Sequence, residues 1–219
     1  MTVPVVTEQP SVEVEETRRL YRWVAPLYDA FRSLWSRWTR PAEEALDRLF
    51  RERIGPATRV LELAPGTGVN VARLLRCAPG FAAYLGIDSS EEMLLRARQK
   101  ARGDSRIELR IGDATHLRAV EGSFDFLVCT WLLSHLDAPA ETVRDALSKL
   151  SPGATAAFVF FTAPHGGLLR YVLARLSGPL RYRFVDAEAI RALPNLERLE
   201  TCVDGMATLA VFRAPGKAD

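Results

Sequence analysis

The sequence lacks a long apolar run and has few cysteines. No apolar stretch approaches the roughly 20 residues that a membrane-spanning helix needs. The three cysteines, Cys77, Cys129 and Cys202, are odd in number, widely spaced and outside metal-ligand pairs. This usage fits a reducing compartment better than a disulfide framework or a zinc site. From this cysteine usage we expect a cytoplasmic protein. Because no two histidines have metal-ligand spacing either, we expect no bound metal.

The sequence also lacks a strong net charge and an export signal. A formal net charge of +2 provides no overall field for nucleic acid or for an acidic partner. Residues 1–16 are acidic, are interrupted by Pro4 and Pro10, and contain no long apolar run, which is unlike a signal peptide. We therefore expect neither a nucleic-acid partner nor a secretory leader.

The length allows one well-buried domain and leaves little room for a second. The chain has 219 residues, of which 48% are hydrophobic, as in an ordinary globular protein. We divide it into a flexible tail at 1–15, an N-terminal helical lid or cap at 16–55 and a core domain at 56–219. Pro26 predicts a break within the cap, and Pro41 fits the first turn of its last helix.

The core domain alternates short apolar runs with helical patterns. We expect strands at 59–64, 83–88, 107–114, 124–130 and 154–162, with a turn at 151–153. Strands alternating with helices imply βαβ units and a parallel sheet. Asp204-Gly205 lies between two further strand-like runs and predicts a C-terminal hairpin. The expected fold class is α/β: a Rossmann-like, doubly wound, mostly parallel seven-stranded sheet with a C-terminal antiparallel hairpin and an N-terminal helical extension.

A glycine-rich loop follows the first strand in Glu62-Leu-Ala-Pro-Gly66-Thr-Gly68. Such a loop exposes backbone N–H groups and lets a ligand approach closely. A dinucleotide fingerprint would have a third glycine where Val71 stands. The Glu62 carboxylate would repel a pyrophosphate and would suit a ligand with an ammonium group. The loop therefore favours S-adenosylmethionine over NAD.

Two further carboxylates close the next two strands. Asp88 ends the second strand, where a carboxylate can accept hydrogen bonds from both hydroxyls of a ribose. Asp113 ends the third strand, where it can accept from an adenine amino group, and Met93 can pack on the adenine face. Because these carboxylates follow successive parallel strands, they should face one crevice.

The ordered segments VLELAPGTG, GIDSSEEML, IGDATHL and FDFLVCTWLLSHL resemble the class I S-adenosylmethionine-dependent methyltransferases. The resemblance covers about 59–162 and is strongest to the small-molecule type 11 group, which includes the ubiquinone/menaquinone-biosynthesis C-methyltransferases. The segment WVAPLYDAF is similar to a helix that precedes the core in that group. Ala64 departs from the family, whose loop often has its first glycine there.

The resemblance implies a set of residues that bind the methyl donor. Glu62 would meet the methionine part, Asp88 the ribose, and Asp113 with Ala114 the adenine. The full set is Tyr21, Tyr28, Glu62, Ala64, Gly66, Gly68, Asp88, Ser89, Met93, Gly112, Asp113, Ala114, Thr130 and Trp131.

The acceptor side has fewer candidates. His135, shortly after the fourth strand, is the candidate catalytic residue, as a general base or an orienting group, or else a structural half-buried histidine. Tyr28 and His165 are candidate substrate contacts, whereas His116 is expected to lie at the surface or behind the residues that contact the ligand.

The aromatic residues of the cap allow three interpretations of their role. Tyr28, Phe31, Trp35 and Trp38 follow helical spacing. They could pack on the core, cover an apolar acceptor, or touch a membrane surface together with nearby arginines.

The resulting functional expectation is methyl transfer to a small, hydrophobic or lipid-like acceptor. The alternatives are a donor-binding regulatory subunit without catalysis and an NAD-dependent oxidoreductase. The sequence indicates no oligomeric state.

Overall fold

The computed structural model describes residues 39–163, 183–202 and 206–216. The expectations for the tail, for Tyr21 and Tyr28, for the aromatic stripe and for His165 lie outside these ranges. Within the described ranges, none of the helices combines the length and apolar character that crossing a membrane would require.

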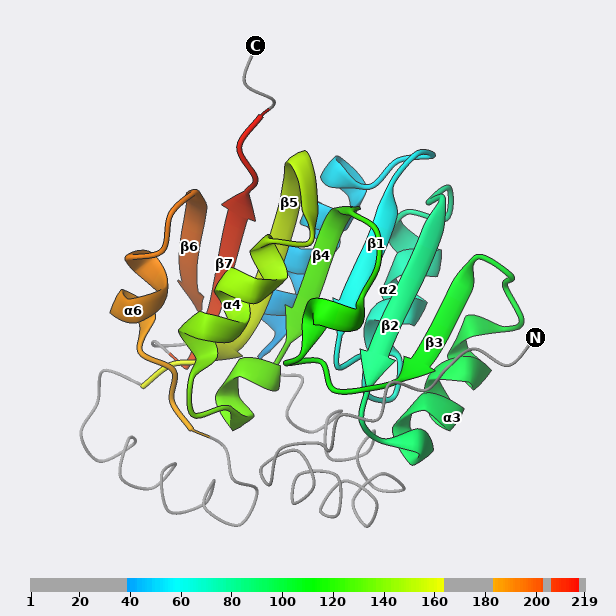
Figure 1. Cartoon of the computed structure of the whole chain (residues 1–219), viewed down its shortest axis with the longest axis horizontal. Helices are drawn as coiled ribbons and strands as arrows, with labels where there is room; N and C mark the ends of the chain where they lie inside the picture. Colours follow the sequence, from blue (N-terminus) through cyan, green and yellow to red (C-terminus); the bar gives the residue numbers. More distant parts are fainter. Residues whose placement is uncertain (1–38, 164–182, 203–205, 217–219) are drawn as a thin grey trace.

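Seven strands form one mixed sheet in the order β3-β2-β1-β4-β5-β7-β6 (Figure 1). Their bounds are β1 Arg59–Leu63, β2 Ala83–Asp88, β3 Ile107–Ile111, β4 Phe124–Thr130, β5 Leu150–Phe161, β6 Leu196–Cys202 and β7 Ala207–Arg213. Strands β1 to β5 pair in parallel, while β7 is antiparallel to both β5 and β6. The predicted fold class is therefore confirmed. The strand order reverses between β1 and β4, which is where open α/β sheets bind ligands.

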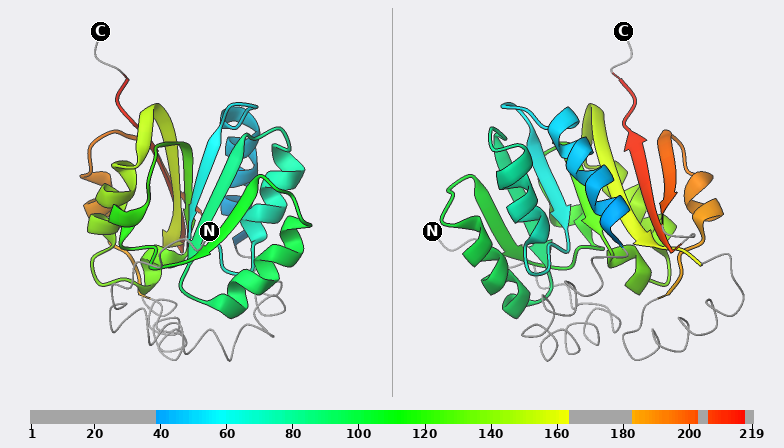
Figure 2. Two further views of the ribbon diagram at one scale, coloured as in Figure 1. Left: turned by 45° about the vertical axis from the view of Figure 1, so that its right-hand side comes forward. Right: turned by 180° about the vertical axis from the view of Figure 1, so that it is seen from behind.

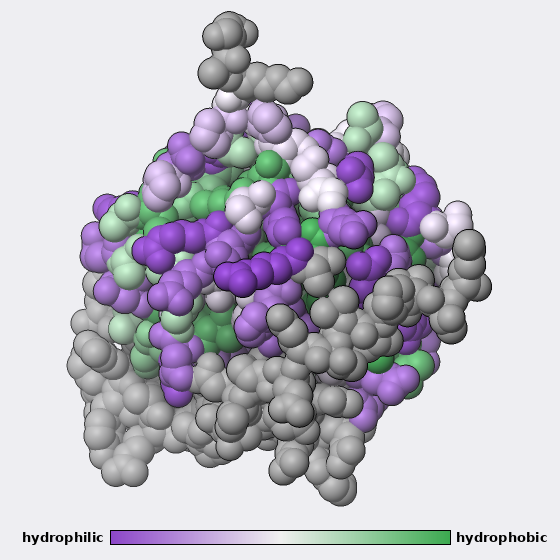
Figure 3. Space-filling view, viewed as in Figure 1, coloured by the Kyte–Doolittle hydropathy of each residue, from purple (hydrophilic) through white to green (hydrophobic). Residues whose placement is uncertain are grey.

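Helices cover both faces of the sheet (Figure 2). The helix at 39–53, α2 (Val69–Cys77) and α3 (Glu91–Ala101) lie on one face, and α4 (Pro139–Leu147) and α6 (Ala187–Arg191) lie on the other. Short 3₁₀ helices follow β3 and β4: η1 (Leu117–Ala119) and η2 (Leu132–His135). Two hydrophobic cores result, one on each face, because alternate strand residues point to opposite sides. Hydrophilic side chains run across the described part of the α4 face, with hydrophobic ones visible between them (Figure 3).

Helix α3 begins as its sequence predicts. The sequence offers Ser89 or Ser90 as the N-cap; in the structure Ser90 is the N-cap, and its hydroxyl accepts a hydrogen bond from the Met93 N–H. Glu91 and Glu92 occupy the first turn, and Arg98 and Lys100 the last, which complements the helix dipole. The helix start is therefore held next to the end of β2.

The expected turn at 151–153 is wrong, because this segment lies inside β5. The register between β4 and β5 shifts here: Phe124 pairs with Leu150 and Phe126 with Thr155, so the extra residues form a bulge. Gly153 takes a φ of 74°, and its N–H donates to the carbonyls of residues 214 and 215. The Gly153 N–H thus has carbonyl acceptors just beyond the end of β7, and the segment 151–153 remains part of β5.

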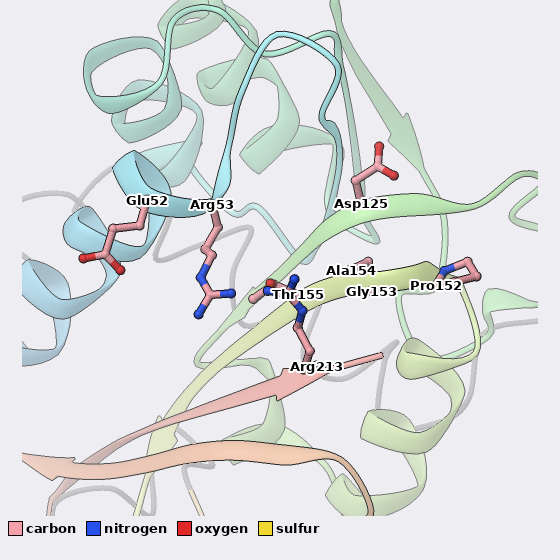
Figure 4. A pocket seen from close by; sticks show the side chains of 8 residues that line it. All are labelled: Glu52, Arg53, Asp125, Pro152, Gly153, Ala154, Thr155 and Arg213. Carbon is pink, nitrogen blue, oxygen red and sulfur yellow. The ribbon is translucent and has the colours of Figure 1, made fainter. Parts of the chain in front are cut away.

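An open pocket of about 550 Å³ lies at this amino-terminal end of β4 and β5. Arg53 and Arg213 point into the same space beside Thr155 (Figure 4). Arg53 also donates to Glu197 at 2.7 Å. The glycine-rich loop lies at the opposite, carboxyl edge of the sheet.

Candidate functional site

The glycine-rich loop joins β1 to α2 at the carboxyl edge of the sheet. Three of its residues take left-handed backbone conformations: Ala64 with φ 53°, Gly66 with φ 54° and Gly68 with φ 78°. A Cβ on Gly68 would lie 2.7 Å from the Cα of Ala97, so the loop packs tightly on α3. A Cβ on Gly66 would meet nothing within 4 Å, so this glycine presents bare backbone to open space.

Asp88 is held at the end of β2 by backbone donors. Its Oδ1 accepts from the Ser90 N–H and its Oδ2 from the Gly66 N–H, both at 2.9 Å. Burial raises the pKa of Asp88, and these backbone hydrogen bonds oppose the rise. The Ser89 backbone also donates to this carboxylate. Because a carboxylate has about four lone-pair positions, these hydrogen bonds leave acceptor capacity for a ligand hydroxyl. Ser89 lies half-buried beside it.

Asp113 follows β3 in a turn that is tied to Asp88. The Gly112 N–H still donates to the Asp88 carbonyl at 3.0 Å, but β3 ends at Ile111, three residues earlier than predicted, because the chain turns at 113–116. Thr115 donates to Asp113 Oδ1 through both its N–H and its hydroxyl. His116 Nδ1 lies 3.0 Å from Asp113 Oδ2 with its side chain exposed, as expected of a surface residue. Ala114 is buried in the same turn.

Glu62 is buried beneath α2, with 1% of its surface exposed. Its Oε2 accepts a hydrogen bond from the Tyr84 hydroxyl and its Oε1 one from Asn70 Nδ2 at 2.7 Å. Burial raises the pKa of Glu62 to about 7, although these hydrogen bonds and the charge of Arg73 lower it in part. The predicted ligand carboxylate is therefore part of an internal polar network.

Sequence reasoning missed three members of this network: Asn70, Arg73 and Tyr84. The signal was present, because Asn70 and Arg73 are polar residues one helical turn apart, next to the apolar Val71 and Leu74. Their burial, however, depends on the helix at 39–53, whose carboxylates pair with Arg73 across the sequence.

An aromatic pair lies at the ends of β4 and β5, where the sequence predicts the acceptor side. The rings of Trp131 and Phe161 lie 4.5 Å apart between centroids and tilted by 31°. Trp131 takes a left-handed φ of 69°, and its N–H donates to the Val159 carbonyl at 2.7 Å. Such a conformation in a bulky residue is uncommon and is typical of functional sites.

His135 ends η2 on the same side and is half-buried. Its neighbour Ser134 accepts a hydrogen bond from the Phe161 N–H at 2.9 Å, which holds η2 against the end of β5. Thr130, which precedes Trp131, accepts from Asn70 Nδ2 at 3.1 Å.

The described residues fit a nucleoside ligand. Carboxylates at the ends of β2 and β3 can accept from hydroxyl and amino groups, and the open Gly66 backbone allows close approach. Met93, with 3% of its surface exposed, packs at the start of α3 beside Asp88. Of the residues predicted to bind the donor, the structure brings these members together at the carboxyl edge: Glu62, Ala64, Gly66, Gly68, Asp88, Ser89, Met93, Gly112, Asp113, Ala114, Thr130 and Trp131.

Comparisons with known proteins identify the relatives of this chain. A family model described as a methyltransferase domain matches residues 60–153. Demethylmenaquinone methyltransferase of Clavibacter sepedonicus is 30% identical over 197 residues, covering 81% of this chain and 79% of that protein. The ubiquinone/menaquinone biosynthesis C-methyltransferase UbiE of Geobacter sulfurreducens is 26% identical over 166 residues, covering 72% and 62%.

A solved structure extends the comparison. The N-methyltransferase NodS of Bradyrhizobium japonicum, crystallised with S-adenosyl-L-homocysteine, superimposes with a TM-score of 0.61 at 18% identity. The match covers 80% of this chain and 87% of that one. At this identity the likeness concerns the fold alone.

Proposed function

This chain belongs to the class I S-adenosylmethionine-dependent methyltransferases, and on that premise we propose that it methylates a small, planar, apolar acceptor. S-Adenosylmethionine is its cofactor, as the sequence predicted. The observation that carries the proposal is the joint placement of the open Gly66 backbone and the Asp88 carboxylate, with the Trp131–Phe161 pair on the acceptor side.

Each end of the donor has a proposed partner. Asp88 accepts from the ribose hydroxyls, and Asp113 and Ala114 meet the adenine, with Met93 on its face. The Glu62 network and Thr130 face the methionine part, and Gly66 allows backbone contact. Support comes from the acceptor capacity left at Asp88 and Asp113 and from the open space at Gly66.

The bound cofactor supplies a methyl carbon made electrophilic by its sulfonium. The chain's own task is to hold the acceptor in line and to exclude water, with reacting atoms about 3 to 3.5 Å apart. Trp131 and Phe161 offer an apolar aromatic surface for this purpose, and Trp131 can also face a cationic centre.

We propose that His135 is the general base when the acceptor must lose a proton, as a hydroxyl or an acidic carbon does. Its position after β4 on the acceptor side supports this role. Replacing His135 with Gln should then lower kcat while leaving the dissociation constant of S-adenosylhomocysteine unchanged. An unchanged kcat would remove the base from the proposal.

The acceptor class rests on two observations. The aromatic pair at the ends of β4 and β5 suits a flat ring better than a strongly polar group. The relatives named above carry the names of menaquinone- and ubiquinone-pathway enzymes, whose acceptors are ring compounds. A naphthoquinol without its ring methyl group is therefore the first acceptor to test.

The cell compartment and surface contacts belong to the same proposal. Cys77, Cys129 and Cys202 are free thiols, which supports a reducing, cytoplasmic setting. Contact of the segment before residue 39 with a membrane surface stays a prediction, and so does the absence of a nucleic-acid partner.

Calorimetry with S-adenosylmethionine, S-adenosylhomocysteine and NAD tests the donor. We expect the first two to bind at micromolar concentration and NAD not to bind. Asp88→Asn should weaken binding at least about tenfold, because the neutral amide loses acceptor capacity toward ribose hydroxyls. Glu108→Gln, an exposed carboxylate on β3, is the matched control and should leave binding unchanged.

Turnover tests the acceptor. Transfer of a labelled methyl group to a naphthoquinol is compared with transfer to a phenol, an amine and a thiol. Donor binding without turnover on any acceptor would favour the regulatory subunit, and binding of NAD alone would overturn the proposal.

A further inference from the structure

A buried polar chain links the helix at 39–53 to the donor site. Arg73, on α2, donates from Nε to Asp47 Oδ1 at 2.6 Å and from Nη2 to Glu43 Oε2. Its Nη1 donates to Asn70 Oδ1. The Arg73 side chain is 5% exposed and Asn70 3%, so this chain runs through the interior between the helix and the sheet.

The Asn70 amide can take one orientation in this setting. A guanidinium only donates hydrogen bonds, so the atom that meets Arg73 must be the amide oxygen. The amide nitrogen then points to Glu62 Oε1 at 2.7 Å and to Thr130 Oγ1 at 3.1 Å. A flipped amide would set its nitrogen against a cation and its oxygen against a carboxylate, and both contacts would be repulsive.

The two groups that Asn70 reaches belong to neighbouring strands at the donor site. Glu62 is on β1, and Thr130 ends β4, which pairs with β1 at the point where the strand order reverses. One amide nitrogen therefore bridges the two strands between which the ligand is expected.

We propose that Arg73 is a positioning residue of the donor site: by holding the amide oxygen of Asn70, it directs the amide nitrogen to Glu62 and Thr130. The inference rests on the proposed function. Arg73 touches neither donor nor acceptor and acts through Asn70.

The charge state of Glu62 provides a second consequence. The charged or titratable groups facing Glu62 are Tyr84 and Asp88 from β2, Arg73 from α2 and Cys129 from β4. Among them Arg73 is the cation, and its charge lowers the pKa of Glu62 against the effect of burial. Without it that pKa rises, so the carboxylate that favours the donor's ammonium forms at a higher pH.

A double-mutant cycle tests the inference. S-Adenosylhomocysteine is titrated calorimetrically into the full-length wild type, Arg73→Met, Asn70→Leu and the double variant. We expect each single change to weaken binding about tenfold or more, as for loss of a hydrogen bond to a charged group. At a pH at which Glu62 is ionised in every variant, Arg73 acts through Asn70, so the double variant should bind no more weakly than Asn70→Leu alone. Multiplied effects in the double variant would overturn the inference.

The pH dependence gives an independent readout that a merely structural arginine would not change. The affinity for S-adenosylhomocysteine should rise with pH as Glu62 ionises. In Arg73→Met, the midpoint of this rise should lie at a higher pH than in the wild type. An unchanged midpoint would contradict the assigned role.

Two variants separate positioning from folding. Asp47→Asn removes one carboxylate from Arg73 but leaves the Asn70 contact, so it should lower thermal stability and change affinity less than about twofold. If Arg73→Met does not fold, Arg73→Lys takes its place in the cycle. Lysine keeps the charge but lacks the planar fork that reaches Asn70 and both carboxylates together. Failure of the wild type to bind would contradict the proposed function itself, whereas wild-type binding with an additive cycle would contradict only the role of Arg73.

Discussion

The hydroxyl of Tyr84 donates a hydrogen bond to the carboxylate of Glu62 in the interior between α2 and the sheet. Tyr84 is on β2 and Glu62 on the neighbouring β1, and both side chains point to the α2 side. Burial raises the pKa of the Tyr84 hydroxyl well above its usual value, and the Glu62 charge raises it further. The tyrosine therefore remains a donor, and Glu62 has a partner for each oxygen.

Removing this donor should destabilise the protein. Tyr84→Phe leaves one buried oxygen of Glu62 without its partner, and we expect a loss of about 1 to 3 kcal/mol in the free energy of unfolding. Urea denaturation monitored by circular dichroism measures it. In a Glu62→Gln background the same substitution should cost less, because no buried carboxylate is left unpartnered. Equal costs in both backgrounds would contradict the coupling.

The pH dependence of stability follows from Glu62. Its pKa is about 7 in the folded state and 4.5 in the unfolded state, so between these values the folded state holds a proton that the unfolded state has released. The stability that this group contributes is present below pH 4.5 and is lost as the pH rises through 7.

Glu62→Gln isolates that contribution. Relative to the variant, the wild type should lose on the order of 3 kcal/mol of unfolding free energy between pH 4.5 and 8, because a tenfold difference in proton affinity between the folded and unfolded states corresponds to about 1.4 kcal/mol. Parallel stability curves for the two proteins would show that Glu62 ionises normally.

The two loop glycines should respond differently to alanine. Gly68→Ala places a Cβ 2.7 Å from the Ala97 backbone at a φ of 78°, and we expect a loss of about 2 to 5 kcal/mol in stability. Gly66→Ala meets no atom and should cost about 1 kcal/mol for its left-handed backbone. Its methyl group enters the space proposed for the donor, so its main effect should be weaker S-adenosylhomocysteine binding. Thermal melts measure the stability of each variant, and calorimetry measures its affinity for S-adenosylhomocysteine. Equal losses of stability and of affinity in the two variants would contradict this prediction.

Ala64 keeps a left-handed backbone that glycine would adopt without strain. Ala64→Gly relieves about 1 to 2 kcal/mol of strain, offset in part by the added freedom of the unfolded chain, for a net gain of about 0.5 to 1 kcal/mol. Ala72, in the middle of α2, is the matched control, since Ala72→Gly should cost about 1 kcal/mol. A loss of stability in both variants would show that Ala64 is unstrained.

Local sequence patterns predicted most of the fold. The expected strands at 83–88 and 124–130 coincide with β2 and β4, because each is a short, mainly apolar run between turn signals, which leaves little choice of boundary. The predicted turn at 151–153 is wrong for a non-local reason: the carbonyls that accept from Gly153 belong to residues 214 and 215, just after β7. Asp88 and Asp113 were found because each follows a recognisable strand.

Arg73 was not found, because an isolated arginine in a helix usually faces solvent. Its partners Asp47 and Glu43 lie 26 and 30 residues away along the chain. The roles of the predicted donor residues and of His135 stay predictions until the binding and turnover experiments are done.

By itself, the sequence determined the alternation of strands and helices, the glycine-rich loop and the family, since each depends on neighbouring residues or on ordered motifs. Only the tertiary structure decided which side chains meet: Gly68 against Ala97, Tyr84 against Glu62, and Arg73 against Asn70 and the helix at 39–53. The physical reason is that burial and charge pairing arise between segments brought together by folding, and no local pattern records them.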